Sequence, residues 1–288
     1  MHRLLAATLA VALLGAAAPQ PADAQGVRQM RQEVEASMLV TGHVDIDRSG
    51  QVTAHELDQR DKLPSYVVNL IERAVPALRF EPVLVDGAPV LARAKMNVRL
   101  IATAVGNGEM RMRIASAHFG ELYSDSDRTS VRRVGTLRPP RYPMNIAQIG
   151  GKGTVYLVLK VGRDGGVEDV VAEQVNLTAL GSARQMEMIR DSLTKASVEN
   201  ARKHWRFVPP SEGDEAAKAY WVVRVPVDFM FEDDRYAAYG QWSAYHPGER
   251  IRPEWTEPTA PGFSPDTLTA GGITPETSRF KLLTPFQG

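Results

Sequence analysis

Residues 45–56 carry oxygen-bearing side chains at the spacing of a calcium-binding loop. The ligands of such a loop would be Asp45, Asp47, Ser49, the Gln51 carbonyl and Glu56. Gly50 stands where the loop must turn sharply. A loop of this kind lies between two helices, whereas residues 40–44 are rich in β-branched side chains and predict a strand. We therefore expect a turn between two strands here, with calcium binding as the alternative.

No other group of residues indicates catalysis or a bound cofactor. The histidines beyond position 25 show no metal-site spacing on a predicted helix: His43, His55, His118, His204 and His246. Ser182 lacks the glycine context of a nucleophile elbow. The glycines of residues 150–153 lead into a predicted strand, whereas a phosphate loop leads into a helix. We expect a protein that is not an enzyme and has no cofactor, with an unrecognised catalytic site as the alternative.

Charge balance and cysteine content narrow the class of protein. Lys plus Arg and Asp plus Glu both number 34 in 288 residues, so the net charge is zero. That balance gives no indication of nucleic acid or of an acidic substrate. The chain has no cysteine, so its stability must come from apolar burial and not from disulfides.

The N-terminus has the order of a secretory signal peptide. His2 and Arg3 precede an apolar run, residues 4–18, that is about 15 residues long and short of the ~20 that a membrane-spanning helix needs. Ala22 and Ala24 place small residues before Gln25. We expect export and cleavage after residue 24, with an uncleaved anchor as the alternative.

Two segments carry the same signals in the same order, which indicates an internal repeat. In each, an alternating strand is followed by a turn, at Gly50 or at Gly165, and a second strand. A segment with helical apolar spacing follows and runs into an Arg-Phe-x-Pro phrase, at 79–82 and at 206–209. We therefore expect an α+β fold of two tandem ββαβ modules, each a small antiparallel sheet with one packed helix. Chance similarity of two unrelated segments is the alternative.

The offset between the copies locates their difference in length. It is 115 residues between the two turn glycines and 127 between the two phrases, so the second copy has 12 extra residues near the start of its helix.

Composition sets the expected boundaries along the chain. They are a signal peptide at 1–24, a first module at 25–118, a linker at 119–136, a second module at 137–234 and a tail at 235–288. Seven prolines lie between residues 247 and 285. We expect a largely disordered tail, with docking of its aromatic residues as the alternative.

The second copy resembles the TonB C-terminal domain family. The residues that carry the resemblance are Pro140-Arg141-Tyr142-Pro143, a strand that opens at Gly153, and Trp205-Arg206-Phe207-Val208-Pro209 after a helix. In that family a Pro-x-Tyr-Pro entry, a Gly-initiated strand and a Trp-Arg-aromatic-x-Pro phrase occur in this order. The match covers about residues 137–232. The first copy has Leu78 in place of the Trp and resembles the family only through the repeat.

The resemblance implies a periplasmic protein-binding module without catalytic activity. Such a module is a TonB-like adaptor or atypical energy transducer that adds an extended peptide to a sheet edge as a strand. The expected partner is an envelope protein, such as an outer-membrane transporter with its N-terminal segment. A scaffold whose modules form a homodimer is the alternative.

The last strand of each module is the edge that such a peptide would use. In the first module a turn at 106–108 and a further alternating strand should cover the edge at 92–103. The second module has no comparable return strand, so we expect docking there, with the proline-rich tail, whose residues 236–245 lie close in the sequence, as the alternative occupant. The expected contact residues are Val222, Val223, Arg224, Val225, Val227, Phe229, Arg141 and Tyr142. Structural roles are expected for Pro140, Pro143, Trp205, Phe207 and Pro209.

We predict that the mature protein begins at Gln25, because small residues stand at the two positions that a signal peptidase reads. Intact-mass measurement of the protein purified from the envelope checks this. Recovery of the full N-terminal segment in the inner membrane would show an uncleaved anchor instead.

Overall fold

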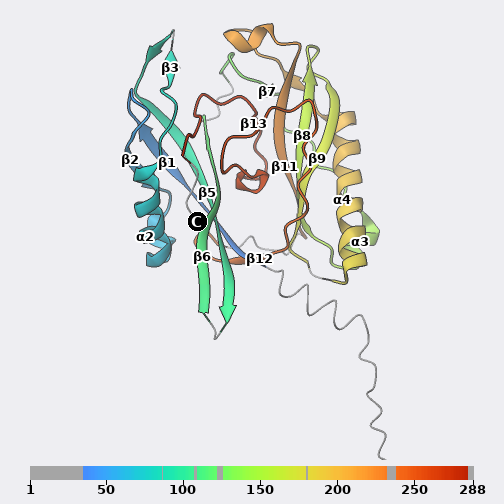
Figure 1. Cartoon of the computed structure of the whole chain (residues 1–288). Helices are drawn as coiled ribbons and strands as arrows, with labels where there is room; N and C mark the ends of the chain where they lie inside the picture. The colour runs from blue at the N-terminus through green and yellow to red at the C-terminus, as the bar shows by residue number, and fades with distance from the viewer. Residues whose placement is uncertain are drawn as a thin grey trace, which may run out of the picture.

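Each half of the chain builds one antiparallel sheet with a helix on its outer side (Figure 1). The fold is α+β, with strands in several antiparallel sheets and few helices. It is a computed structural model that describes residues 35–85, 87–106, 109–121, 126–179, 181–231 and 238–284. The expected signal peptide at 1–24 lies outside these residues.

The first sheet contains four long or medium strands. β1 (Glu35–Ile46) forms a hairpin with β2 (Val52–Leu57), and α2 (Ser65–Ala74) follows. β5 (Ala92–Gly106) then pairs with the other side of β1, and β6 (Glu109–Gly120) folds back on β5. The sheet order is therefore β12-β1-β5-β6, with β2 also on β1. The added strand that was expected to cover the first module's edge is confirmed as β6.

The second sheet repeats this connectivity. β8 (Gly153–Gly162) forms a hairpin with β9 (Val167–Leu177), and α4 (Ala183–His204) follows. β11 (Tyr220–Phe229) pairs with the other side of β8. Here the neighbour of β11 is β13 (Thr274–Pro275), and the sheet order is β13-β11-β8-β9. β13 thus takes the place that β6 takes in the first sheet.

Short elements connect these strands and helices. They are η1 (Arg60–Lys62), η2 (Val75–Ala77), β3 (Leu84–Val85), β4 (Ala88–Pro89), β7 (Arg132–Arg133), α3 (Met144–Gln148), β10 (Phe207–Val208), η3 (Asp214–Ala217), β12 (Ser243–Tyr245) and η4 (Pro265–Thr267).

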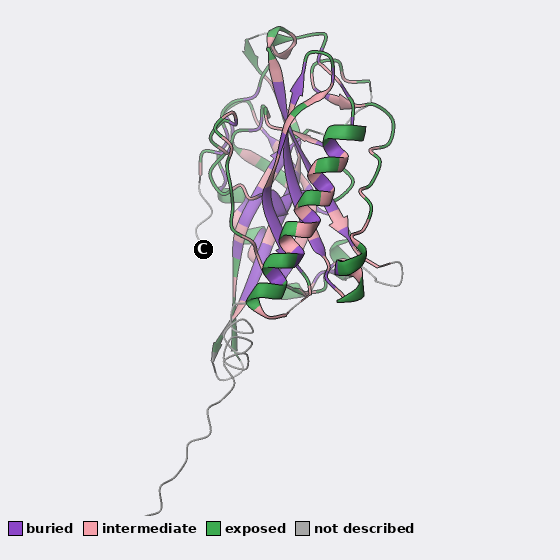
Figure 2. Cartoon of the chain, turned by 90° about the vertical axis from the view of Figure 1, so that its right-hand side faces the viewer, coloured by how far each residue is buried: buried purple, intermediate pink, exposed green. Residues whose placement is uncertain are grey.

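Apolar alternation along the strands builds one core under each helix. Val40 and Met96 belong to the first core, and Leu157 and Val225 to the second. Figure 2 shows α4 with its exposed side outward and buried strands behind it. No helix in the described part of the chain is long and apolar enough to span a membrane.

The two turn glycines occupy matching environments. Gly50 and Gly165 have φ of +83° and +77°. The Gly50 carbonyl accepts the Phe80 N–H at 2.8 Å, and the Gly165 carbonyl accepts the Phe207 N–H at 2.9 Å. A Cβ at either glycine would lie 1.9 or 2.1 Å from the carbonyl oxygen of the same phenylalanine, so only glycine fits.

The two helices differ in length, as the two offsets predict. α4 has 22 residues and α2 has 10, and Ser182 caps α4 together with Gln185. The 12 extra residues therefore lengthen the helix of the second half.

The tail is ordered along its described residues, so the expectation of a largely disordered extension is wrong. It runs between the two sheets, with both helices on the outside (Figure 1). Phe280 and Leu282 are buried in the first core, and Ile273 is buried in the second. Proline prevents helices and central strands, but an extended segment still adds to sheet edges and buries apolar side chains. Docking of the tail, the alternative, holds for its described residues.

The expected linker at 119–136 is divided between the two halves. Phe119 and Gly120 belong to β6, and Phe119 is buried in the first core, whereas a later part of the segment packs on the second half. β7 pairs with β10, and Val131 is buried in the second core. The polar composition of this segment did not reveal that pairing, because a two-residue strand has no periodicity of its own.

Trp205 is 2% exposed in the second core, and its Nε1 donates to the Arg138 carbonyl at 2.8 Å. We predict that Trp205→Ala lowers the free energy of unfolding by about 3–5 kcal/mol, because it removes a large buried side chain. The measurement is denaturant unfolding followed by circular dichroism.

Leu91→Ala is the matched control, because Leu91 is 68% exposed and its truncation should change stability by less than about 0.5 kcal/mol. Equal stability of Trp205→Ala and the parent would contradict the core role.

Candidate protein-binding site

The β11 edge, where docking was expected, carries a segment of the tail. Val223 lies opposite Pro275 and Arg224 opposite Thr274 in an antiparallel pairing. The Glu276 N–H donates to the Val222 carbonyl at 2.9 Å. The edge therefore already holds an extended segment of the same chain.

The side chains expected to contact a partner at this edge are buried. Val223, Val225, Val227 and Phe229 belong to the second core, and Val222 is 8% exposed on the opposite face. Both faces of β11 are covered, so none of these side chains is available for contact with another protein. Of these five residues, Val222 directs its backbone groups toward the tail, and the other four, which alternate with it, direct theirs toward β8. The apolar alternation in the sequence predicted the strand correctly. It did not show that the other face of the strand, with Val222 and Arg224, is buried as well.

Arg224 holds the tail and is not an exposed contact residue. Its side chain is 5% exposed, and its Nε lies 2.7 Å from Glu173 Oε2. Its Nη2 lies 3.3 Å from Glu276 Oε1, beside the β13 strand. Arg250 in the tail binds the other Glu173 oxygen at 3.0 Å. Burial raises the pKa of Glu276 although Arg224 lowers it, so desolvation outweighs the ion pair.

Proline limits how far a strand can extend along this edge. Val222 and Arg224 direct backbone groups toward the tail, and alternate residues of a strand point the same way. Pro226 is therefore the next residue on the outward side, and it has no N–H to donate. Edge prolines of this kind protect sheets from uncontrolled pairing.

The calcium-like loop is a β-hairpin turn. Strands β1 and β2 flank it, where a calcium loop needs helices. Arg93 binds the Asp45 carboxylate at 2.6 Å and lowers the pKa of that group. Asp47 Oδ1 accepts hydrogen bonds from the Ser49 hydroxyl and from the Ser49 and Gln51 N–H groups. The geometry does not support the calcium alternative. Asp45 pairs with Arg93, and Glu56 of β2 lies opposite His43 of β1, away from the turn.

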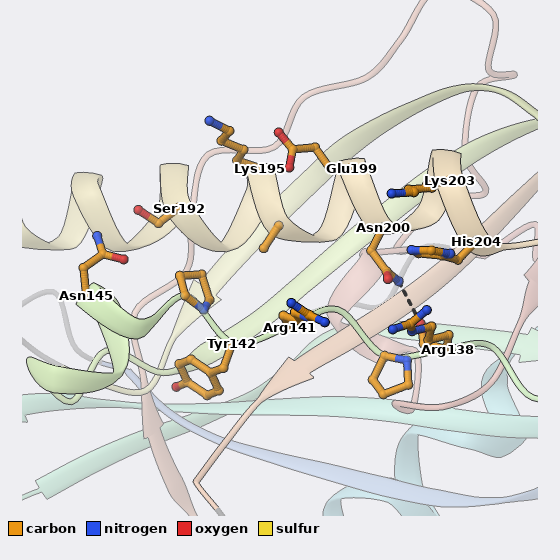
Figure 3. A pocket seen from close by; sticks show the side chains of 13 residues that line it. Arg138, Arg141, Tyr142, Asn145, Ser192, Lys195, Glu199, Asn200, Lys203 and His204 are labelled. Carbon is orange, nitrogen blue, oxygen red and sulfur yellow. Dashed lines mark hydrogen bonds between the residues drawn. The ribbon is translucent and has the colours of Figure 1, made fainter.

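A groove of about 720 Å³ lies between α4 and the entry segment at 138–145 (Figure 3). Side chains three or four residues apart form its helix wall and share one face of α4. They are Ser192, Lys195, Glu199, Asn200, Lys203 and His204. The opposite wall includes Arg138, Arg141, Tyr142 and Pro143.

Two hydrogen bonds to one carbonyl fix the floor of this groove. Asn200 Nδ2 and Trp205 Nε1 donate to the Arg138 carbonyl at 2.7 and 2.8 Å. The Tyr142 hydroxyl donates to the Gly151 carbonyl at 2.5 Å, and its ring contacts Phe229 edge-on at 5.4 Å. Tyr142 thus positions the segment, whereas Arg141 is exposed in the groove.

The groove is strongly basic. Burial and the positive charges of Arg138, Lys203 and Arg206 lower the pKa of His204. Arg138, Lys195 and Lys203 were not among the expected site residues. Their signal in the sequence was the polar face of the predicted helix, but the entry segment across from it is apparent only in the folded chain.

A cavity of about 410 Å³ lies between the two sheets and is walled by the tail. His118, Arg224, Phe263 and Glu276 line it. Burial, together with the charges of Arg224 and Lys95, lowers the pKa of His118 to about 4. Among the described residues, no group of three or more His, Asp or Glu side chains is placed to hold a metal ion.

A solved structure is similar to part of this chain. The solution NMR structure of Pseudomonas aeruginosa TonB CTD matches with 21% sequence identity and a TM-score of 0.20. The match covers 38% of this chain and 95% of that chain. No family model and no curated protein matches. A TM-score of 0.20 is too low to support a functional inference, so the β11 edge and the groove bear on function through their own geometry.

We predict that His118 makes the protein less stable as the pH falls from about 6.5 toward 4. In this range the unfolded chain, with a His pKa near 6.5, takes up a proton that the folded chain does not bind. The free energy of unfolding should therefore fall by up to about 1.4 kcal/mol per pH unit through this one group. Denaturant unfolding at pH 7 and pH 5 measures it.

His118→Gln supplies the control, since glutamine does not titrate. The variant should lose less stability than the parent between the two pH values. Identical pH dependence in parent and variant would show that His118 is not responsible.

Proposed function

We propose that this chain is a periplasmic protein-binding protein without catalytic activity. In this proposal it consists of two divergent ββαβ modules, and the second binds an extended segment of a partner by strand addition at β11. The partner class is an envelope protein, with the N-terminal segment of an outer-membrane transporter as the first candidate.

The observation that carries the proposal is the tail segment on β11. Residues 274–276 are extended, pair antiparallel with Val223 and Arg224, and donate a backbone hydrogen bond to Val222. An edge that accepts one extended segment through backbone groups has the geometry to accept another of similar shape. The segment is also short, so few hydrogen bonds must break for it to be replaced.

The contrast between the two halves supports the choice of β11. β6 pairs with β5 from Lys95 to Gly106, whereas β13 pairs with two residues of β11. The first edge is therefore closed by a long hairpin and the second by a small removable piece. Partner binding is expected at the edge that costs less to open.

The matching turns support the descent of both halves from one module. In each half the turn glycine has a positive φ and its carbonyl accepts the N–H of the phenylalanine in the Arg-Phe-x-Pro phrase. The strand order around the central strand is also the same.

The test supplies the tail segment in trans. A fluorescent peptide with the sequence of residues 271–278 is added to the parent and to a variant with residues 273–276 replaced by glycine. We predict binding to the variant and little binding to the parent, because the parent's own segment is present at an effective concentration in the millimolar range. Fluorescence anisotropy gives the affinities.

N-methylation of the peptide provides a control that leaves the protein unchanged. A methyl group on the Glu276 nitrogen removes the bond to Val222 and should weaken binding roughly tenfold, whereas methylation at Thr277 should not. Equal binding of both peptides would reject strand addition. A glycine variant that forms dimers and binds neither peptide would favour the scaffold.

A further inference from the structure

Four cations line the groove, two on each wall. Arg138 and Arg141 lie on the entry segment, and Lys195 and Lys203 lie on α4 (Figure 3). Within the part of the chain that the structure describes, none of these four side chains forms an ion pair. The chain has no net charge, so this is a local concentration of positive charge.

Helix stability explains only part of this pattern. Lys203 is in the last turn of α4, where a cation stabilises the helix dipole. Lys195 and Lys203 are each four residues from Glu199, a spacing that supports a helix. Neither effect accounts for Arg138 and Arg141, which belong to an extended segment on the other wall.

The spacing of the cations indicates a linear ligand. Lys195 and Lys203 are eight residues apart on a helix, which corresponds to about 12 Å. Arg138 and Arg141 are three residues apart, which corresponds to about 10 Å in an extended chain. One small anion can reach only one end of such a groove. Carboxylates at positions i and i+4 of an extended peptide are about 13 Å apart and reach both ends.

The remaining lining residues favour a peptide over other polyanions. Asn145, Ser192 and Asn200 bring amide and hydroxyl groups to the groove, and these match the polar groups of a peptide backbone. Glu199 stands midway between the two lysines and disfavours a third acidic group at the centre. The site is concave, whereas a flat membrane surface would meet a flat or convex basic patch.

We propose that the groove between α4 and the entry segment binds an extended acidic peptide. Two carboxylates of this peptide are four positions apart, and the residue midway between them is neutral. The low pKa of His204 agrees with a positive potential there. This site lies on the α4 side of the second sheet and not at the β11 edge, so it goes beyond the function proposed above. Neither proposal depends on the other.

The test measures binding of designed peptides to the full chain. A labelled nine-residue peptide carries Glu at two positions four apart, with Gly, Ser and Thr elsewhere. A second has Gln in place of both Glu residues, and a third has an additional Glu at the centre. Fluorescence anisotropy should show the first peptide binding at least tenfold more tightly than the second and more tightly than the third, with weaker binding at higher salt.

Protein variants test the site. Arg141→Ala and Lys203→Ala should each weaken binding of the first peptide roughly fivefold, as loss of one exposed ion pair does. Arg184→Ala is the matched control, because Arg184 is an exposed cation on α4 that does not line the groove. Circular dichroism confirms that all variants are folded.

Three results would overturn the proposal. One is equal binding of the Glu and Gln peptides, and another is an equal effect of Arg184→Ala and the groove variants. The third is preferential binding to heparin or to vesicles of anionic phospholipid that Arg141→Ala weakens while the acidic peptide does not compete. That outcome would assign the groove to a polyanion or a membrane.

Discussion

Buried polar side chains on the facing sides of the two sheets find their hydrogen-bond partners in the C-terminal tail. Asn97 Nδ2 donates to the Thr267 carbonyl at 2.9 Å, and Arg99 donates to the Asp266 carbonyl. On the second sheet the buried Glu173 is bound by Arg250 as well as by Arg224. A buried polar group without a partner costs about 1–3 kcal/mol, and a buried charge costs more. The two sheets face each other in this way only because the tail lies between them.

The tail contains parts that are fixed and one part that is easier to exchange. η4 is fully enclosed, with Thr267 at 0% exposure and Asp266 at 5%, and its removal would expose several unsatisfied groups at once. β13 contributes two paired residues at the margin of a sheet, and burial disfavours the charged form of Glu276, the residue that follows it. Displacement of β13 therefore leaves the packing of η4 intact. Under the proposal of strand addition, the β11 edge would open while the contacts of η4 with both halves remain.

Local patterns in the sequence predicted the strands and helices of each half but not the path of the tail. Gly50 and Gly165 marked their turns because a positive φ favours glycine, and Trp205 and Phe207 marked the second core because large aromatic residues are buried together. A proline-rich extended segment has no periodicity, so its destination depends on sheet edges and buried groups far away in the chain. The same limit applies to the groove. The polar face of α4 was present in the sequence, but Arg138 and Arg141 lie opposite it only after folding.

The tether on β13 determines how a competing peptide must act. Residues 282 and 246 on either side of it bridge to Phe80 of the first half and to Leu177 of the second. The enclosed Thr267 lies closer, seven residues before Thr274, and Leu282 lies seven residues after Pro275. Under the proposal of strand addition, a released β13 would therefore remain tethered near the edge at a high effective concentration. Under the same proposal, contacts outside the edge would help a partner to compete with the tethered segment. The basic groove lies on the same half of the chain. If both proposals hold, a partner with an acidic segment for the groove and an extended segment for β11 would bind more tightly than a partner with either one alone.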